Sequence, residues 1–257
     1  MLRRFLLPTT VTGKLLACFV LLCLLICSTA YGQQKESLPS ADDVLEAFYE
    51  SLGGEMAIAG MSEIRFKGTF GGPASGNLEV KYKDGKFAFE YDLEGFGRLR
   101  QGFDGTSWWR SMPDQQIEVL EGEDKAMASQ LSFCTPQFLD WRDFDGTIEV
   151  VEAADFRGTD VWHLTFTDEV GAAVNRFFDQ ESGLLVASNL KTKQADSTTL
   201  YEFEEFEGVL WASRIISETR IDGVDEMYST EILFTEYDFD AELDDDELAM
   251  PGKDSDN

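Results

Sequence analysis

From residue 63 onward, hydrophobic and polar residues alternate one for one along most of the chain. Ile64, Phe66 and Phe70 alternate with charged or polar residues, and the same pattern returns over 78–83 and 87–92. Successive side chains of a β-strand point to opposite faces, so this period of two predicts strands with one buried face. Strands with one polar face are typical of antiparallel sheets. The chain is therefore expected to be mainly β.

Asp-Gly dipeptides separate several of these segments. Asp-Gly favours a two-residue hairpin turn, because both central residues of a type I′ turn need a positive φ. The four dipeptides are Asp84-Gly85, Asp104-Gly105, Asp145-Gly146 and Asp222-Gly223. Further strands are predicted at about 97–103, 106–111, 116–120, 147–153, 160–167, 173–179, 184–191, 198–206, 213–221 and 226–237. An antiparallel meander this long must curl, close or split into two sheets.

A helix is predicted before the first strand. Ser40 can cap its amino end, the acidic Asp42 and Asp43 suit the helix dipole, and Gly53-Gly54 ends it. Its apolar stripe consists of Val44, Leu45, Phe48 and Leu52. A second interruption at 121–141 fits one or two short helices, with apolar residues Ala126, Met127, Leu131, Phe133 and Phe138. Both helical segments could cover the open face of a curved sheet.

Residues 1–32 are predicted to be a secretory signal peptide. Arg3, Arg4 and Lys14 precede an apolar run of 13 residues, and small residues follow at Ala30 and Gly32. We expect cleavage after Gly32 and a mature protein in the periplasm or outside the cell. The alternative is an uncleaved membrane anchor. Residues 33–240 show no linker and are expected to form one domain, and 241–257 are expected to be an acidic tail.

The charge of the chain excludes several partners. There are 49 Asp and Glu against 21 Lys and Arg, which gives a formal net charge of −28. Such a surface repels nucleic-acid phosphates and anionic membranes, whereas a basic protein would be attracted. One His in the whole chain makes acid–base catalysis at neutral pH and a His-rich metal site difficult to build.

No catalytic, metal-binding or cofactor-binding motif is present. His163 is predicted to lie on the polar face of its strand, opposite Trp162 and Leu164. Cys134 is expected to be a small buried residue. The run Asp143-Phe144-Asp145-Gly146 resembles a calcium loop only superficially, because Trp141 occupies the first ligand position. Asp244–Glu247 are expected to be solvated. We therefore predict no catalytic residue, no metal and no cofactor.

Aromatic residues are the most informative feature that remains. There are 20 Phe, 7 Tyr and 5 Trp, and many of them occupy the inward positions of the alternating strands. A strongly curved half-barrel has more inward positions than short helices can cover, so part of this set could line an apolar cavity. The predicted ligand-binding residues are Phe66, Leu78, Val80, Tyr82, Phe87, Phe89, Tyr91, Trp162, Leu164 and Phe166. Val44, Leu45, Phe48 and Leu52 would form a lid. The alternative is that the same residues simply fill a core.

Several short motifs occur together in a recognisable order. They are Ser51-Leu52-Gly53-Gly54, Lys67-Gly68-Thr69, the run Gly102–Trp109, Arg176-Phe177-Phe178-Asp179 with Ser182-Gly183-Leu184-Leu185, and Leu248-Ala249-Met250-Pro251-Gly252. With the export signal, they make the chain resemble the lipoprotein-carrier superfamily of bacterial envelopes, the LolA/LolB-like and LppX-like proteins, over about 40–252. The resemblance implies an incomplete antiparallel β-barrel, with the amino-terminal helix and a short helical insertion as a lid over an apolar cavity.

Three functional hypotheses follow. The first is an exported, non-enzymatic binding protein that shelters a lipid, an acyl chain or a lipoprotein anchor. The second is an acidic structural or interaction module of the cell envelope with a filled core and no ligand. The third is a hydrolase with paired carboxylates, for which no sequence spacing singles out a pair. A continuous apolar void of roughly 300 Å³ or more would favour the first.

Overall fold

The structure of the protein is a computed structural model. It describes residues 37–54, 58, 61, 63–113, 115–122, 124–125, 128, 141–169 and 171–252. The chain divides into two units, Met1–Leu38 and Pro39–Asn257, and every described helix and strand belongs to the second. The predicted signal peptide and Cys134 lie outside the described residues. So do the apolar residues expected in the helical insertion, Ala126, Met127, Leu131, Phe133 and Phe138.

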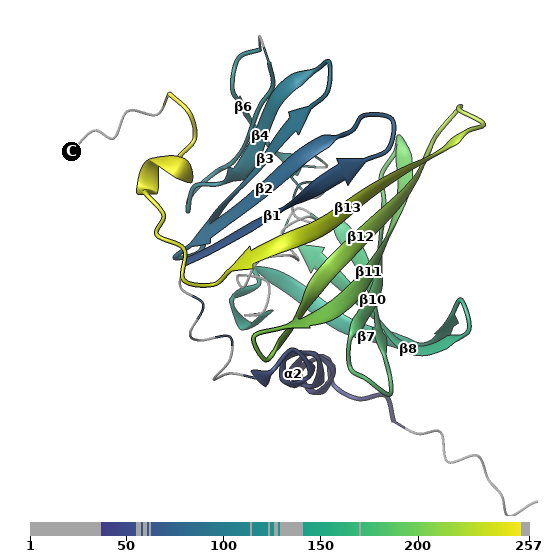
Figure 1. The fold of residues 1–257 in the computed structure, drawn as a ribbon. Coiled ribbons are helices and arrows are strands. Elements are labelled where there is room, and N and C mark those ends of the chain that lie inside the picture. The colour runs from purple at the N-terminus through teal and green to yellow at the C-terminus, as the bar shows by residue number, and fades with distance from the viewer. Residues whose placement is uncertain are drawn as a thin grey trace, which may run out of the picture. The chain divides into compact units, whose positions relative to one another are not determined.

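Thirteen antiparallel strands form a single sheet (Figure 1). They are β1 (Glu63–Gly71), β2 (Gly76–Lys83), β3 (Lys86–Leu93), β4 (Gly97–Phe103), β5 (Trp108–Ser111), β6 (Glu118–Val119), β7 (Gly146–Phe156), β8 (Thr159–Asp168), β9 (Ala173–Asp179), β10 (Leu185–Lys191), β11 (Ala195–Phe206), β12 (Val209–Ile221) and β13 (Met227–Asp238). The order across the sheet is β6-β5-β4-β3-β2-β1-β13-β12-β11-β10-β9-β8-β7. The first strand pairs with the last, and β6 and β7 are the two edges. The predicted mainly β, incomplete antiparallel barrel is confirmed.

The turns follow the expected chemistry in part. Asp84 and Gly85 have φ of 48° and 78°, as a type I′ hairpin between β2 and β3 requires. The prediction for Asp145-Gly146 is wrong, because Gly146 opens β7 without a positive φ. Asp104-Gly105 and Asp222-Gly223 do lie in turns, but these are longer than two residues and only the glycines have a positive φ. Arg157-Gly158 and Glu207-Gly208 make two further turns with positive φ at both residues. Neither contains the Asn or Asp that marks such a turn in a sequence.

The predicted amino-terminal helix is α2 (Ala41–Ser51). The Asp43 backbone N–H donates to the Ser40 hydroxyl at 3.1 Å, and the Ser40 backbone N–H donates to the Asp43 carboxylate at 3.0 Å. This reciprocal capping box satisfies two amide groups that the first turn would otherwise leave unpaired. Gly53 and Gly54 follow the helix with positive φ, as expected. No helix in the described part of the chain is both long and apolar enough to cross a membrane.

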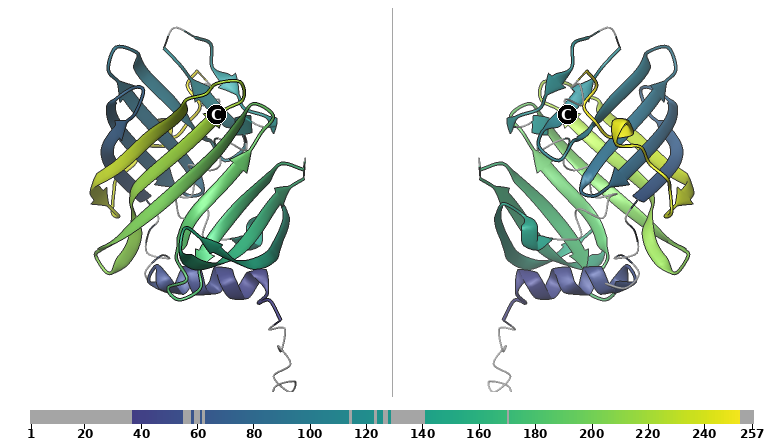
Figure 2. Two further views of the ribbon diagram at one scale, coloured as in Figure 1. Left: turned by 90° about the vertical axis from the view of Figure 1, so that its right-hand side faces the viewer. Right: turned by 90° about the vertical axis from the view of Figure 1, so that its left-hand side faces the viewer.

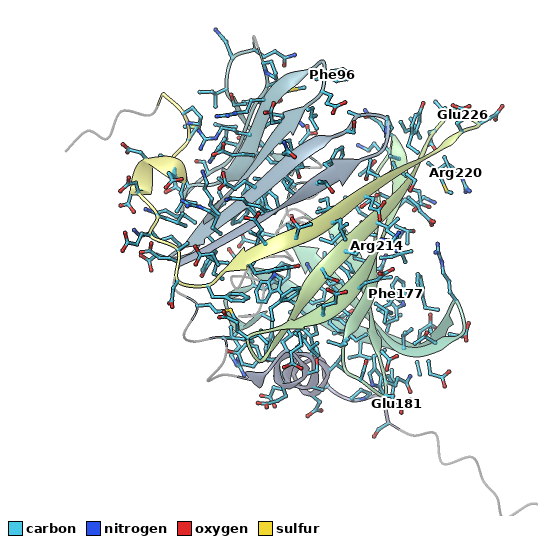
Figure 3. All side chains as sticks on the ribbon, in the orientation of Figure 1. Phe96, Phe177, Glu181, Arg214, Arg220 and Glu226 are labelled. Atoms are coloured by element: carbon cyan, nitrogen blue, oxygen red, sulfur yellow. The ribbon has the colours of Figure 1, made fainter. Side chains whose placement is uncertain are left out.

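The two ends of the sheet differ. At the helix end, α2 lies beside the β9–β10 turn, which carries Glu181, and the Leu210 N–H donates to the Leu52 carbonyl at 3.0 Å (Figures 2 and 3). At the opposite end, the hairpin end, β12 carries Arg220 close to its last residue, and the connection to β13, which carries Glu226, extends past the neighbouring strands (Figure 3). One end of the curved sheet is thus covered by a helix, and the other is bordered by turns.

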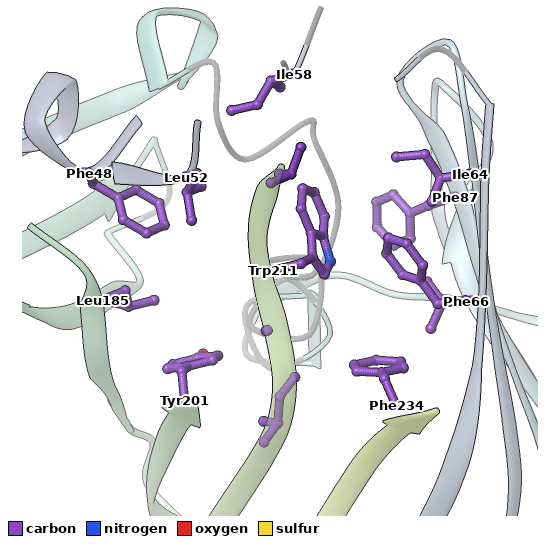
Figure 4. Packing of buried hydrophobic residues seen from close by; sticks show 14 of the residues in the cluster. Phe48, Leu52, Ile58, Ile64, Phe66, Phe87, Leu185, Tyr201, Trp211 and Phe234 are labelled. Carbon is purple, nitrogen blue, oxygen red and sulfur yellow. The ribbon is translucent and has the colours of Figure 1, made fainter. Parts of the chain in front are cut away.

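The inner face of the sheet, to which Phe66 belongs, is filled by one large apolar cluster. Side chains from β1–β3 meet side chains from β8–β13, and α2 adds its apolar stripe. Figure 4 shows Trp211 between Leu52, on the side of the helix, and Phe66 and Phe87 of the facing strands. The ring centroids of Phe66 and Trp211 are 5.4 Å apart. The two halves of the sheet therefore pack on each other through aromatic rings.

The outer face of β1–β5 is partly covered by the segment that follows β13. Leu248 is fully buried against Ala88 and Trp109, and the short 3₁₀ helix Asp245–Glu247 precedes it. Ala241 and Leu243 are buried as well. Asp244, Asp245 and Asp246 are exposed, as expected of solvated acids, whereas Glu247 is partly buried. The carboxyl-terminal segment, Ala241–Met250, thus packs on the sheet through its apolar residues.

A glycine substitution in β1 tests the register of the first and last strands. A Cβ added at Gly68, beside the irregularity in the β1–β13 pairing, would lie 2.3 Å from the Leu233 carbonyl oxygen. Because backbone cannot yield as a flexible side chain does, Gly68→Ala should lower the free energy of unfolding by about 2 kcal/mol in urea titrations. Gly71→Ala in the same strand is the control, since nothing lies within 4 Å of its Cβ position. Equal stability of the two variants would contradict this register.

Candidate functional site

The residues predicted to bind a ligand do come together. Eight of the ten are buried and the other two, Tyr82 and Trp162, are partly buried, and all ten belong to the inner-face cluster. The four predicted lid residues, three from α2 and Leu52 directly after it, are buried in the same cluster. Their contact with a ligand remains a prediction.

Most of these residues pack against one another and leave no cavity between them. Phe66, Val80, Phe87 and Phe89 are each 1 % exposed. The ring centroids of Phe87 and Phe89 lie 5.8 Å apart at 84°, an edge-to-face contact that aromatic pairs favour. The inner face near the helix end is therefore a packed core in this conformation.

A pocket of about 190 Å³ opens on the inner face toward the hairpin end. Its lining residues are Phe70, Tyr91, Ser197, Thr199, Tyr201, Ile215, Ser217, Thr219, Thr230 and Ile232. Tyr91 is the one predicted ligand-binding residue among them. Drug-sized ligands usually occupy roughly 300–1,000 Å³, so the pocket as it stands has room for part of such a ligand.

The two walls of this pocket differ in chemistry. One wall, from β1 and β3, presents the rings of Phe70 and Tyr91, whose centroids are 5.5 Å apart. The facing wall, from β11 to β13, presents rows of hydroxyl groups. Tyr201, Ile215 and Ile232 form its deeper part and also belong to the apolar cluster. The pocket thus has an aromatic wall and a hydroxyl-bearing wall, and it borders the packed interior.

Hydroxyl groups cross the inner face from strand to strand. The Ser197 and Thr219 hydroxyls are 3.0 Å apart, and those of Thr199 and Ser217 are 2.9 Å apart. The hydroxyl of Tyr201 is 3.0 Å from that of Ser188 on β10. We call these six residues the hydroxyl rows. Ser188, Ser197, Thr199 and Tyr201 are buried among them, so the inner face of β10–β12 is more polar than that of β1–β3.

Arg176 on β9 is buried next to these rows. Its side chain belongs to the inner face with Val174 and Phe178, and its guanidinium carbon lies 3.9 Å from the centre of the Phe166 ring. Burial lowers the pKa of Arg176 to about 9, and the nearby Tyr201 partly offsets this effect. A buried guanidinium stacked on an aromatic ring is a site where an anionic group would be stabilised.

Sequence reasoning missed both the hydroxyl rows and Arg176. The signal was present in the period of two: Ser197, Thr199 and Tyr201 occupy alternate positions of β11, and Arg176 stands two residues before the buried Phe178. Serine and threonine at alternate positions usually indicate a solvent-facing side. Only the curvature of the sheet turns this side inward, so the pattern by itself does not reveal it.

A second hollow, of about 850 Å³, lies on the outer face between the sheet and the carboxyl-terminal segment. Lys83, Arg98 and Arg100 line it together with Glu90 and residues 243–247. The Lys81 ammonium group lies nearby, 2.8 Å from Glu247, 3.1 Å from Glu90 and 3.3 Å from Glu79. These alternating charges hold the segment on the sheet.

The other residues considered as functional in the sequence do not contribute a reactive or metal-binding group to the inner pocket. His163 lies on the outer face as predicted, stacked on Phe177 at 4.8 Å and with Nε2 2.9 Å from the Asn175 side-chain oxygen. No group of three or more His, Cys, Asp or Glu suited to a metal ion occurs among the residues described. The lining of the inner pocket contains no carboxylate, so the hypothesis of paired catalytic carboxylates finds no support there.

Comparisons with known proteins agree with this architecture. No protein-family model and no curated protein matches the sequence. A LolA superfamily protein from Nitrosomonas europaea superposes with a TM-score of 0.57 at 14 % identity, over 82 % of this chain and 98 % of that one. An outer membrane lipoprotein-sorting domain from Vibrio parahaemolyticus gives 0.52 at 12 % identity, over 81 % and 97 %. A DUF1329 family protein from Desulfovibrio piger also gives 0.52, at 10 % identity, over 81 % and 96 %. The chain therefore has the fold of LolA superfamily and lipoprotein-sorting proteins.

Proposed function

We propose that the chain is an exported, non-enzymatic binding protein that shelters the acyl chain of a lipid or of a lipoprotein anchor. The observation that supports this most is the inner pocket, which has no charged residue in its lining and continues into a large apolar cluster. Each CH₂ group transferred from water contributes about 0.8 kcal/mol, so apolar contact alone could hold a chain of moderate length. The shared fold with a lipoprotein-sorting domain is consistent with this role.

Binding would require side chains to move. The pocket of about 190 Å³ is smaller than the site of a whole lipid. Phe70 is partly buried and packed against the cluster, and Tyr91 beside it is a buried member of the cluster. An entering chain would displace these rings or the lid residues of α2. Since β6 and β7 are not paired with each other, the sheet could also widen between its two halves.

The strongly acidic composition fits a carrier that travels between surfaces. With a formal net charge of −28, the protein is repelled by anionic membranes and attracted by basic proteins. We propose a basic protein partner for loading or delivery, and export through the predicted signal peptide.

Titration of delipidated protein with a fluorescent fatty acid tests the function. We expect saturable binding that Thr230→Glu weakens at least tenfold, because a carboxylate in the uncharged lining of the pocket would lose hydration when the chain enters. Thr235→Glu is the matched control, since Thr235 is an exposed threonine of the same strand. The absence of saturable binding of both the fatty acid and an uncharged amphiphile of equal chain length to the unmodified protein would remove the carrier hypothesis.

The second candidate is the acidic interaction module with a filled core. One observation favours it: the predicted cavity-lining residues Phe66, Phe87 and Phe89 are packed and 1 % exposed. This candidate predicts no uptake of fatty acid and unchanged thermal stability in the presence of lipid. The same titration therefore separates the two functions.

A further inference from the structure

We propose that the inner pocket binds the uncharged, hydroxyl-bearing head group of an amphiphile, a glycerol or sugar head whose acyl chain continues into the apolar cluster. This inference rests on the proposed function and adds the chemical class of the ligand. The geometry that carries it is a pocket lined by hydroxyl groups of β11–β13 and by the aromatic rings of Phe70 and Tyr91.

The lining selects against a charged head group. None of the ten lining residues is charged, although 27 % of the chain is Asp, Glu, Lys or Arg. A charge moved from water into such a site loses hydration and gains no opposite charge, which is unfavourable. An uncharged polyol loses far less hydration free energy, because hydroxyl groups of the protein can replace the water molecules bound to it.

The hydroxyl rows can form the hydrogen bonds that a polyol makes with water. Each hydroxyl has one proton to donate and two lone pairs to accept. In the pair Ser197–Thr219, one hydroxyl donates to the other, so the acceptor keeps its own proton for another partner. The pair Thr199–Ser217 offers the same, and Thr230 adds a further hydroxyl on β13. These groups form an array of donors and acceptors spaced by the sheet, as a polyol requires.

The rest of the pocket suits the apolar parts of the same ligand. The rings of Phe70 and Tyr91, which stand nearly perpendicular to each other, line the same pocket as the hydroxyls of β11–β13 and offer apolar contact to the C–H groups of a sugar or glycerol unit. Ile215 and Ile232 lie in the pocket and are also buried members of the apolar cluster. A head group held at the hydroxyl rows would therefore direct its chain toward the interior. At about 30 Å³ per water molecule, 190 Å³ corresponds to roughly six waters, enough for a small head group.

An anionic head group is the principal competitor. Arg176 is buried on the same inner face, and a carboxylate or phosphate could bind there. Arg176 is not part of the pocket lining, however, and the net charge of the chain opposes the approach of an anion. We therefore assign the pocket to a neutral head group, and the test includes an anionic probe.

Calorimetric titration of the delipidated full-length protein with three amphiphiles of equal chain length provides the test. The probes are dodecyl glucoside, dodecanoate and dodecyltrimethylammonium, each below its micelle concentration and at two salt concentrations. We expect dodecyl glucoside to bind at least about tenfold more tightly than dodecanoate, with little dependence on salt, because its head group makes uncharged hydrogen bonds.

The variant Thr199→Val with Thr219→Val removes two hydroxyls and keeps the side-chain shape. It should weaken dodecyl glucoside about tenfold and leave dodecanoate unchanged, while Thr235→Val on the outer face should change neither. If the double variant does not fold, Thr219→Val alone should weaken dodecyl glucoside about threefold. Equal binding of all three probes, or tighter binding of dodecanoate, overturns the head-group assignment and leaves the carrier function intact. Failure of every probe to bind overturns both.

Discussion

Phe66→Ala should lower the free energy of unfolding by about 3–5 kcal/mol, the usual cost of removing a buried phenylalanine. Phe66 is 1 % exposed, and its ring centroid lies 5.0 Å from that of Tyr237 and 5.4 Å from that of Trp211. Rings from β1, β12 and β13 thus meet at this residue. Its removal leaves a cavity between the two halves of the sheet that rigid aromatic neighbours cannot close. Urea titration followed by tryptophan fluorescence measures the change.

Phe96→Ala is the control for this variant. Phe96 lies in the β3–β4 turn with 68 % of its surface exposed, so its removal should change stability by no more than about 0.5 kcal/mol. A loss below about 1 kcal/mol for Phe66→Ala would show that the interior readily collapses or admits water. That result would contradict a packed core at the helix end and favour an adaptable cavity there.

Lys81→Ala is expected to destabilise the protein by about 3 kcal/mol, because it leaves three carboxylates close together without their common cation. The Lys81 side chain is 8 % exposed, on the outer face of β2, and its ammonium lies within 3.3 Å of Glu79, Glu90 and Glu247. The side chains of Glu79 and Glu247 remain 28 % and 30 % exposed. The expected destabilisation therefore lies at the lower end of the values found when one partner of a buried ion pair is removed. The carboxyl-terminal segment should loosen in this variant, and hydrogen exchange at Leu248 would report it.

The stabilisation by Lys81 and its carboxylate partners should depend on pH. Partial burial raises the pKa of Glu247, but hydrogen bonds from Lys81 and from the Asp244 N–H outweigh it, so the pKa lies below the ordinary 4.5. A carboxyl with a lowered pKa in the folded state stabilises the protein above its unfolded pKa and loses this effect as the pH falls through its folded pKa. Burial lowers the pKa of Lys81, and its bonds to Glu247 and Glu90 raise it to a net value above 10.5. The cost of Lys81→Ala should therefore be largest at neutral pH and shrink below about pH 4.

Lys67→Ala serves as the matched control for the cation. Lys67 pairs with Glu236 at 3.4 Å, but the two side chains are 52 % and 68 % exposed, so solvent and salt screen the pair. We expect a change between about 0 and 1 kcal/mol. If Lys81→Ala and Lys67→Ala were equally mild at neutral pH, the charge network would not be what holds the carboxyl-terminal segment.

The strands were predictable because their signal is local. Alternation of apolar and polar residues requires only that one face of each strand be buried, and the predicted 97–103 and 173–179 match β4 and β9 at both ends. The helix was equally local, since Ser40, Asp43 and the glycines after Leu52 define it within one short segment. The turn at Arg157-Gly158 was not predictable from its residues, because the pairing of β7 with β8 imposes a positive φ on an arginine.

The candidate pocket was only partly predictable. The aromatic half of the inner face followed from the large apolar residues of β1–β3, and Tyr91 was correctly included among the inward residues. The hydroxyl rows were not predicted, because serine and threonine at alternate positions of a strand indicate a solvated face. They face the interior since β11–β13 curve round to oppose β1 and β3.

The carboxyl-terminal segment shows the same limit. Its four consecutive acidic residues are typical of a solvated tail, and three of them are exposed. Leu243 and Leu248 beside them are buried, because the outer face of β2–β5 offers Lys81, Arg100, Ala88 and Trp109 as partners. The strands that bind this segment lie more than 100 residues earlier in the chain. No pattern within the segment itself therefore predicts that it packs on them.

The sequence alone determined the secondary structure, the antiparallel sheet and the net charge, because periodicity, turn chemistry and composition are properties of neighbouring residues. The tertiary structure decided where the interior is packed and where a pocket remains. It also placed the hydroxyl rows opposite the aromatic wall and docked the carboxyl-terminal segment on the outer face. These features depend on the pairing of β1 with β13 and on the curvature of the sheet, which bring residues from distant parts of the chain into contact. Such contacts have no local pattern that would predict them.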